Sequence, residues 1–159
     1  KLTAPDDVAI LTFANGLHMS LRAERILRER HNIHACVVDL RWLNPLNEAF
    51  ILEQALATGN VLVVDESRRT GGVAESILAL IYEHCGSRVR AARLNAKDTY
   101  IPLGPAADRV LPQEADAVRA ARDLLDSDRR GKTNVPRTVS NKLSSMQTRP
   151  KPSRIRRKT

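Results

Sequence analysis

The sequence predicts an α/β fold: a three-layer α/β/α sandwich around a mostly parallel sheet of about four to five strands. Short apolar runs rich in β-branched residues alternate with segments of helical periodicity, about 10 to 15 residues each, which is typical of parallel sheets covered on both faces. The run at residues 61–64 then leads through a charged turn and two glycines into a helix. In open α/β sheets, turns of this kind lie at the carboxyl edge of the sheet, where functional sites are usually built.

The first half of the chain contains two predicted strands, at residues 8–13 and 35–40, each followed by a helix. Asn15-Gly16 is a turn signal that also suits the start of a helix, and His31-Asn32 closes that helix. Asn44-Pro45 fits a helix cap followed by proline at the first helical position. The second helix is predicted over 48–58 and ends at a glycine cap, Gly59.

The second half repeats the pattern with a third strand at 61–64 and a weaker fourth strand at 88–94. The fourth strand has charges interleaved among its apolar residues, so we place it toward a sheet edge. Two prolines and a glycine exclude regular structure over 98–105. The two remaining helices each carry one apolar stripe. The stripes are Ala74, Ile77, Leu78, Ile81, Tyr82 and Cys85, and then Ala117, Val118, Ala121, Leu124 and Leu125.

Charge divides the chain of 159 residues into two parts. Residues 127–159 hold 11 Lys/Arg against one acid, whereas residues 1–126 hold 15 bases and 17 acids. We therefore predict one folded domain at 1–126 and a basic tail at 127–159 that is disordered by composition. The tail lacks aromatic residues for stacking on bases, so a nucleic-acid partner is not expected.

The two cysteines, Cys36 and Cys85, form no CxxC or Cys/His metal spacing, and the sequence shows no secretory signal. We interpret both cysteines as free thiols in a reducing cytosol, and we therefore expect a cytoplasmic protein. No apolar run approaches the length of about 18 residues that a membrane span needs.

The turn after the third strand is the candidate functional segment. A helix N-terminus offers unpaired N–H groups and partial positive charge, so the turn could bind an anion or form an interface. The alternative is that the glycines only allow a tight turn and the arginines are solvated or paired with nearby acids. The candidate residues are Glu66, Arg68, Arg69, Thr70, Gly71 and Gly72.

No residue is assigned a catalytic, cofactor-binding or metal-binding role. The four histidines have no HxxxH or HExxH spacing, and no GxSxG motif accompanies any serine. Asp65 and Glu66 are neighbours at a strand end, so their side chains point in different directions and do not form an acid/base pair.

Five motifs in this order resemble the C-terminal domain of the transketolase family. Among its members, the sequence is most similar to the β-type portion of the thiamine-diphosphate-dependent 2-oxoacid dehydrogenases, the E1 components. The resemblance covers about residues 6 to 126, with Tyr100-Ile101 where the family often has proline and phenylalanine. The motifs are Asp7–Thr12, Val38–Leu46, Thr58–Glu66, Thr70–Glu75 and Asp98–Pro102.

This resemblance implies a domain for assembly and interfaces that is not catalytic by itself. Thiamine diphosphate and magnesium would belong to the parent enzyme, a 2-oxoacid dehydrogenase or a transketolase-like transferase, and not to this chain. The implied partners are the thiamine-binding domains or subunits, a second copy in a homodimer, and an acyltransferase core. An alternative from the residues themselves is a free-standing module that holds an anionic partner through Gly71-Gly72 or the basic tail.

Overall fold

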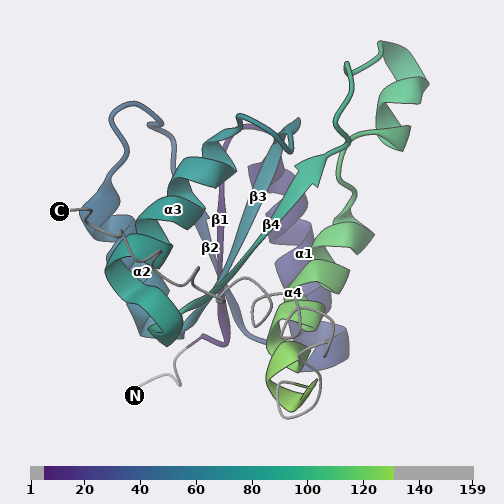
Figure 1. Cartoon of the computed structure of the whole chain (residues 1–159). Helices are drawn as coiled ribbons and strands as arrows, with labels where there is room; N and C mark the ends of the chain where they lie inside the picture. Colours follow the sequence, from purple (N-terminus) through teal and green to yellow (C-terminus); the bar gives the residue numbers. More distant parts are fainter. Residues whose placement is uncertain (1–5, 131–159) are drawn as a thin grey trace, which may run out of the picture. The chain divides into compact units, whose positions relative to one another are not determined.

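The computed structural model describes residues 6–130 (Figure 1). The chain divides into two units, Lys1–Asp128 and Arg129–Thr159, and the α/β fold belongs to the first. The last helix continues to Arg130, past the predicted end of the folded domain at residue 126. From position 131 onward, the predicted basic tail lies outside the described residues.

Four parallel strands form one sheet in the order β2-β1-β3-β4. The central strand β1 pairs on both sides, so that Leu11 lies opposite Val38 on β2 and Val63 on β3. This confirms the prediction of an α/β sandwich with a parallel sheet. The strands are β1 (Val8–Thr12), β2 (Ala35–Asp39), β3 (Asn60–Arg68) and β4 (Arg90–Ala96).

Two helices cover each face of the sheet (Figure 1). Helices α2 and α3 pack against one face, and α1 and α4 pack against the other. Each face therefore has its own aliphatic core, as a doubly covered parallel sheet requires. The helices are α1 (Gly16–His31), α2 (Glu48–Thr58), α3 (Val73–Cys85) and α4 (Glu114–Arg130).

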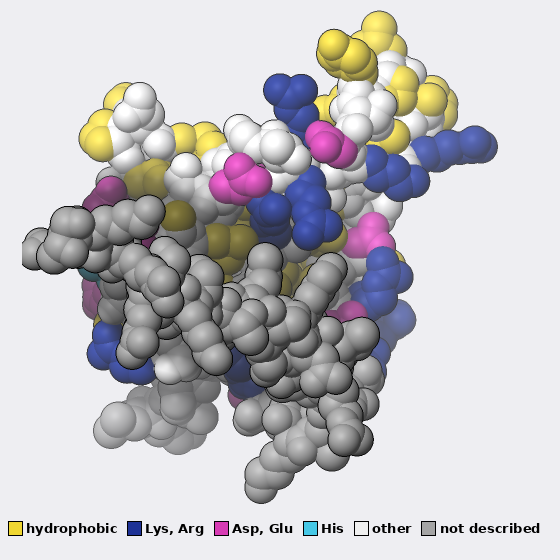
Figure 2. Space-filling model, in the orientation of Figure 1, with side chains coloured by type: hydrophobic (Ala, Val, Ile, Leu, Met, Phe, Trp, Pro, Cys, Tyr) yellow, Lys and Arg dark blue, Asp and Glu magenta, His cyan; other side chains and the backbone are white. Residues whose placement is uncertain are grey.

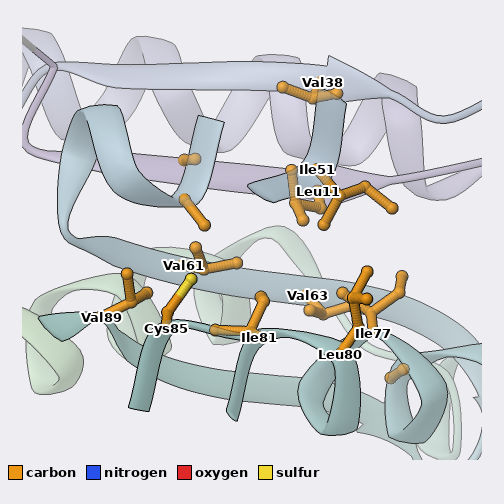
Figure 3. Close-up of a cluster of buried hydrophobic side chains, with 13 residues drawn as sticks. Leu11, Val38, Ile51, Val61, Val63, Ile77, Leu80, Ile81, Cys85 and Val89 are labelled. Carbon is orange, nitrogen blue, oxygen red and sulfur yellow. The ribbon is translucent and has the colours of Figure 1, made fainter. Parts of the chain in front are cut away.

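Strand β3 supplies side chains to both cores, because successive residues of a strand point to opposite faces. Val61 and Val63 enter the core that α2 and α3 cover, and Figure 3 shows them facing Ile77 and Ile81 of α3. Leu62 and Val64 enter the opposite core. All four β3 residues are fully buried, and each contributes about 1.5–3 kcal/mol to folding relative to exposure. The uninterrupted apolar run is thus explained by burial on both faces.

The helix ends follow the sequence signals with one correction. Asn32 and Gly59 end α1 and α2 in the left-handed conformation, with φ of 52° and 69°. Asn44-Pro45, however, does not start α2 and instead forms a cis peptide before the helix. Asn47 is the cap, because its side-chain oxygen accepts the backbone N–H of Phe50 at 3.2 Å. A cap needs a side chain within reach of the first turn, and Asn44 lies three positions before the cap residue Asn47.

The edge strand β4 is shifted from its predicted position. It runs from Arg90 to Ala96, because residues 86–88 form a 3₁₀ turn instead of the predicted start of a strand. It does lie at the edge of the sheet, as its interleaved charges predicted. The neighbouring strand β3 extends beyond residue 64 to Arg68, and its register with β4 shifts between Asp65 and Arg68. This bulge shapes the turn that follows.

Candidate functional site

The predicted turn lies at the carboxyl edge of the sheet, between the end of β3 and the start of α3. Asp65 is the last residue of β3 before the bulge and is fully buried. Its Oδ1 accepts the backbone N–H of Ser67 at 2.8 Å, and its Oδ2 accepts the N–H of Ala74 at 3.1 Å. Ala74 belongs to the first turn of α3, where negative charge is stabilising. The anion at this helix N-terminus is therefore a carboxylate of the chain itself.

A second carboxylate closes the outer side of the turn. Glu75 Oε2 accepts the backbone N–H of Gly71 at 3.0 Å, while Glu75 Oε1 accepts a bond from Arg93 Nη1, also at 3.0 Å. The same Arg93 nitrogen donates to the carbonyl oxygen of Arg69 at 2.9 Å. The bond from Arg93, and then the bond from Gly71, hold the pKa of Glu75 below its usual range. Strand β4, helix α3 and the turn are thus joined through one ion pair.

The two glycines are required for different reasons. Gly71 has φ of +75°, in the left-handed region where residues with a Cβ are strained. Gly72 has an ordinary extended backbone, but a Cβ there would overlap Ser67 Oγ and lie 2.8 Å from Asp65 Oδ2. One glycine permits the turn, and the other makes room for the buried carboxylate.

The six candidate residues do not converge on one site. Arg68, Arg69 and Thr70 are exposed, and Thr70 Oγ1 donates to Asp98 Oδ2 at 3.4 Å. Glu66 is half-buried and faces a cleft of about 540 Å³ between the N-terminal ends of α1 and α4. Arg69 lines a different cleft. The role of these residues as an interface or anion turn stays a prediction.

The cleft beside Arg69 has a volume of about 470 Å³ and is built mainly by the end of β4. Arg93 and Asn95 of β4 line it, and so do Lys97 and Asp98, which follow the strand. The charges of β4 predicted only an edge strand. The cluster of polar residues at the end of this strand was the signal that could have indicated the cleft.

Both carboxylates of the turn are engaged within the fold. Asp65 is buried and bound to two backbone N–H groups, and Glu75 is bound to Arg93. Among residues 6–130, no group of three or more His, Cys, Asp or Glu side chains is placed to hold a metal ion. Within the same range, no helix is both long and apolar enough to cross a membrane.

Comparison with known proteins identifies relatives over most of the chain. Residues 1–116 match the family model described as "Transketolase, C-terminal domain". The chain is 35% identical over 125 residues to the 2-oxoisovalerate dehydrogenase subunit beta of Bacillus subtilis, which covers 76% of this chain and 38% of that protein. It is 34% identical over 122 residues to the pyruvate dehydrogenase E1 component subunit beta of the same organism, with 76% and 37% covered.

A third relative, 1-deoxy-D-xylulose-5-phosphate synthase 1 of Geobacter sulfurreducens, is 33% identical over 104 residues, which is 65% of this chain and 16% of that enzyme. The fold is similar to a solved structure titled "Split gene transketolase, inactive beta4 tetramer", with a TM-score of 0.67 and 23% identity. That match covers 78% of this chain and 40% of the other. The chain therefore spans less than two-fifths of the curated relatives it matches. With its family model, its ordered motifs and its fold in agreement, this chain belongs to the transketolase C-terminal domain family.

Proposed function

We propose that this chain is the C-terminal assembly domain of a thiamine-diphosphate-dependent enzyme, either a 2-oxoacid dehydrogenase E1 component or a transketolase-like enzyme. The observation that carries the proposal is the family match over residues 1–116. Two relatives at 34–35% identity are beta subunits of 2-oxoacid dehydrogenases, and the chain corresponds to 37–38% of each. The parent enzyme would be active, and this part of it would support assembly.

The residues of this chain do not fit thiamine diphosphate. A diphosphate would need the free N–H groups of a helix N-terminus or a magnesium ion held by oxygen ligands. At the start of α3, however, the N–H of Ala74 is already bound to the buried Asp65 carboxylate, and the N–H of Gly71 is bound to Glu75. We therefore derive no catalytic step in this chain, and we assign cofactor and magnesium to the parent enzyme.

The partners that we propose are parts of the same enzyme: its thiamine-binding domains or subunits, and a second copy in a homodimer. An acyltransferase core is a further proposed partner if the parent is an E1 component. The exposed members of the candidate turn, Arg68, Arg69 and Thr70, would lie at such a contact. A cytoplasmic location agrees with two free cysteines, Cys36 and Cys85.

The alternative function, a module that holds an anionic partner, is supported by the cleft that carries Arg69, Arg93 and Lys97. Three cations face this cleft with one acid, Asp98. The Gly71-Gly72 turn itself supports it less, because the two N–H groups beside it already bind carboxylates. The tail lies outside the described residues from position 131 onward.

Titration calorimetry of the full chain separates the two functions. With thiamine diphosphate and magnesium, we expect only the heat of dilution, and micromolar binding would overturn the assignment of a non-catalytic domain. Magnesium pyrophosphate in a parallel titration tests the anion-binding alternative. If pyrophosphate binds, Arg69→Gln and Lys97→Gln should weaken it, whereas Arg88→Gln, far from the cleft, should not.

A further inference from the structure

The outer side of β4 is an open sheet edge. In the described part of the chain, β4 pairs with β3 alone and is the outer strand on its side of the sheet (Figure 1). The N–H of Arg90 donates to the carbonyl oxygen of Gly59, just before β3. Because the backbone groups of successive residues in a strand point to opposite sides, those of Ala91, Arg93 and Asn95 face away from β3. Such outward donors and acceptors can pair with another extended chain.

The edge is covered at its end and uncovered near its start. The N–H of Lys97 also points to the outer side, and it donates to the carbonyl oxygen of Val110 at 2.9 Å. Edge strands are usually protected by charged side chains, prolines or bulges. Ala91 is exposed and too short to shield the backbone, and Arg90 is turned toward β3, where its Nε donates to Asn60 Oδ1 at 2.9 Å. The edge between these points is therefore accessible to a partner.

Two hollows follow β4 along this edge. The first, which we call the apolar hollow, has a volume of about 230 Å³ and lies between α3 and the start of the strand. The second is the cationic cleft of about 470 Å³ at the end of the strand. Residues 93–98 line this cleft without a gap, and successive side chains of a strand point to opposite faces, so the cleft opens along the edge and not on one face. The apolar hollow is lined by Leu78, Ile81, Tyr82, Gly86, Val89 and Ala91.

The cationic cleft has two cations that are available to a ligand. Arg69 and Lys97 are exposed and form no ion pair within residues 6–130. Arg93 is not counted with them, because Glu75 holds it. Asp98 is the acid of the lining, so positive charge is in excess. Figure 2 shows Lys and Arg side chains gathered at the base of the protruding segment that follows β4. The complement of this end of the strand is a carboxylate, and that of the other end is an apolar side chain.

We propose that the open edge of β4 binds an extended segment of a partner protein, which adds a strand to the sheet. The side chains of this segment that face α3 are apolar beside the apolar hollow and acidic beside the cationic cleft. Ala91 and Lys97 lie on the same face, about 20 Å apart at ~3.3 Å per residue, so the apolar and acidic side chains occupy alternate positions. The proposal deepens the anion-binding alternative above, on whose cleft it rests, and is independent of the assembly role.

Synthetic peptides test the proposal on the full chain. The probe is a blocked, fluorescein-labelled heptapeptide, as long as β4, with valine at its first and third positions, glutamate at its fifth and seventh, and threonine between them. A second peptide has the reverse order, because an added strand can be parallel or antiparallel. We expect one of the two to bind in the micromolar range by fluorescence anisotropy. Replacing its glutamates by glutamine should weaken binding at least tenfold.

Backbone methylation separates strand addition from attraction between charges. In an added strand, only alternate N–H groups of the peptide face β4. Methylating the nitrogens of one alternate set should therefore abolish binding, and methylating the other set should leave it nearly unchanged. Equal effects of the two sets would overturn the proposal. Binding of magnesium pyrophosphate without binding of either peptide would also overturn it, while leaving the anion-binding alternative intact.

Variants of the chain locate the contact. Lys97→Gln should weaken peptide binding at least fivefold, whereas Arg30→Gln, which removes an exposed cation at the end of α1, should not. Tyr82→Ser removes a side chain that is 78% exposed and lines the apolar hollow, so it should also weaken binding. Leu21→Ser on α1, where the side chain is 48% exposed, is its control.

A proline substitution tests the edge itself. Ala91→Pro removes an N–H that faces away from β3, so the sheet should persist while peptide binding falls at least tenfold. Far-ultraviolet circular dichroism checks that this variant is folded, and the methylated peptides decide the question if it is not. A folded Ala91→Pro variant that binds as tightly as the parent would contradict strand addition.

The single tryptophan is an internal control. Trp42 is 69% exposed and follows β2, the outer strand on the other side of the sheet. Its emission should therefore stay constant when the peptide binds at β4. A shift of this emission on binding would place the peptide at the wrong edge and overturn the proposal. Failure of both peptide orders to bind, or equal weakening by Lys97→Gln and Arg30→Gln, would do the same.

Discussion

Asp65 is the residue that decides what the turn after β3 can bind. Its carboxylate is fully buried and accepts the N–H groups of Ser67 and Ala74. A buried acceptor of this kind is costly to desolvate and is stable only because both oxygens are hydrogen-bonded. Gly72 leaves the space that the carboxylate fills. The anion-binding character of a helix N-terminus is thus used inside the fold, to hold the end of β3 against the start of α3.

Glu75 gives the turn a dependence on pH. The bonds from Arg93 and Gly71 lower the pKa of Glu75, so folding favours its charged form. The resulting stabilisation is fully present above the ordinary glutamate pKa of about 4.3 and is lost as the pH falls through the lower pKa of the folded state. We expect Glu75→Gln to lower the free energy of unfolding at neutral pH, and the difference from the parent to shrink on acidification.

Urea unfolding followed by far-ultraviolet circular dichroism at a series of pH values measures this difference. Glu53→Gln, which removes an exposed glutamate from α2, controls for the loss of one carboxylate. The ion pair is partly open to solvent, with side-chain exposures of 43% for Glu75 and 22% for Arg93, so the effect should be modest. A difference that is constant from neutral to acidic pH would show that the Glu75 carboxylate does not stabilise the turn.

At the scale of elements, the contribution of the N-cap of helix α2 to stability can be measured by comparing Asn47 with the nearby Asn44. Asn47→Ala removes the oxygen that accepts the N–H of Phe50, and should cost about 1 kcal/mol of stability. Asn44→Ala is the matched control: the same change, three residues earlier, at a position that does not cap the helix. Thermal unfolding should separate the two variants by several degrees, with Asn44→Ala close to the parent. The reverse order would mean that the helix begins earlier than Glu48.

The same helix shows what the sequence could predict. Its bounds, Glu48–Thr58, and its glycine cap, Gly59, follow from local composition and from the conformational freedom of glycine, so they were predicted correctly. The cap residue was predicted wrongly, because Asn44-Pro45 and Asn47 are both plausible signals and only the path of the chain selects between them. A pattern within one segment thus predicts that a helix forms more reliably than it predicts the residue at which the helix begins.

Strand pairing explains the remaining differences. The apolar run at 61–64 marks only the part of β3 that is buried on both faces, whereas the strand continues to Arg68 because it pairs with β4. The bulge between Asp65 and Arg68, and the cleft that Arg69 lines together with residues 93–98, depend on a contact between segments far apart in the sequence. The residues of the turn could therefore be predicted from the sequence. That Glu66 and Arg69 line two separate clefts could not.

For the molecule as a whole, we expect the basic tail to be dispensable for folding. Residues 131–159 contain nine Lys/Arg and no Asp/Glu. Their sequence shows no apolar periodicity that could add to either core. A chain that ends after Arg130 keeps all of α4, so its melting temperature should be close to that of the full chain. It should lose salt-sensitive binding to heparin.

A second chain that ends after Asp126 shows whether the last four residues of α4 add stability. Both melting and retention on a heparin column are measured for the two truncations and the full chain. A fall of many degrees on cutting after Arg130 would mean that the tail packs on the folded domain. Unchanged heparin binding would mean that the exposed arginines of the domain, and not the tail, attract polyanions.

The placement of the aromatic residues also decides how this domain can be observed. A protein with an aliphatic core and an exposed Trp42 has a tryptophan spectrum that barely distinguishes the native monomer from the unfolded chain. A fluorescence melt would therefore miss the loss of the sheet, which far-ultraviolet circular dichroism records. In turn, any large change in the emission of this chain reports a new neighbour at the β2–α2 segment. The emission of Trp42 therefore changes little on unfolding but reports selectively on association.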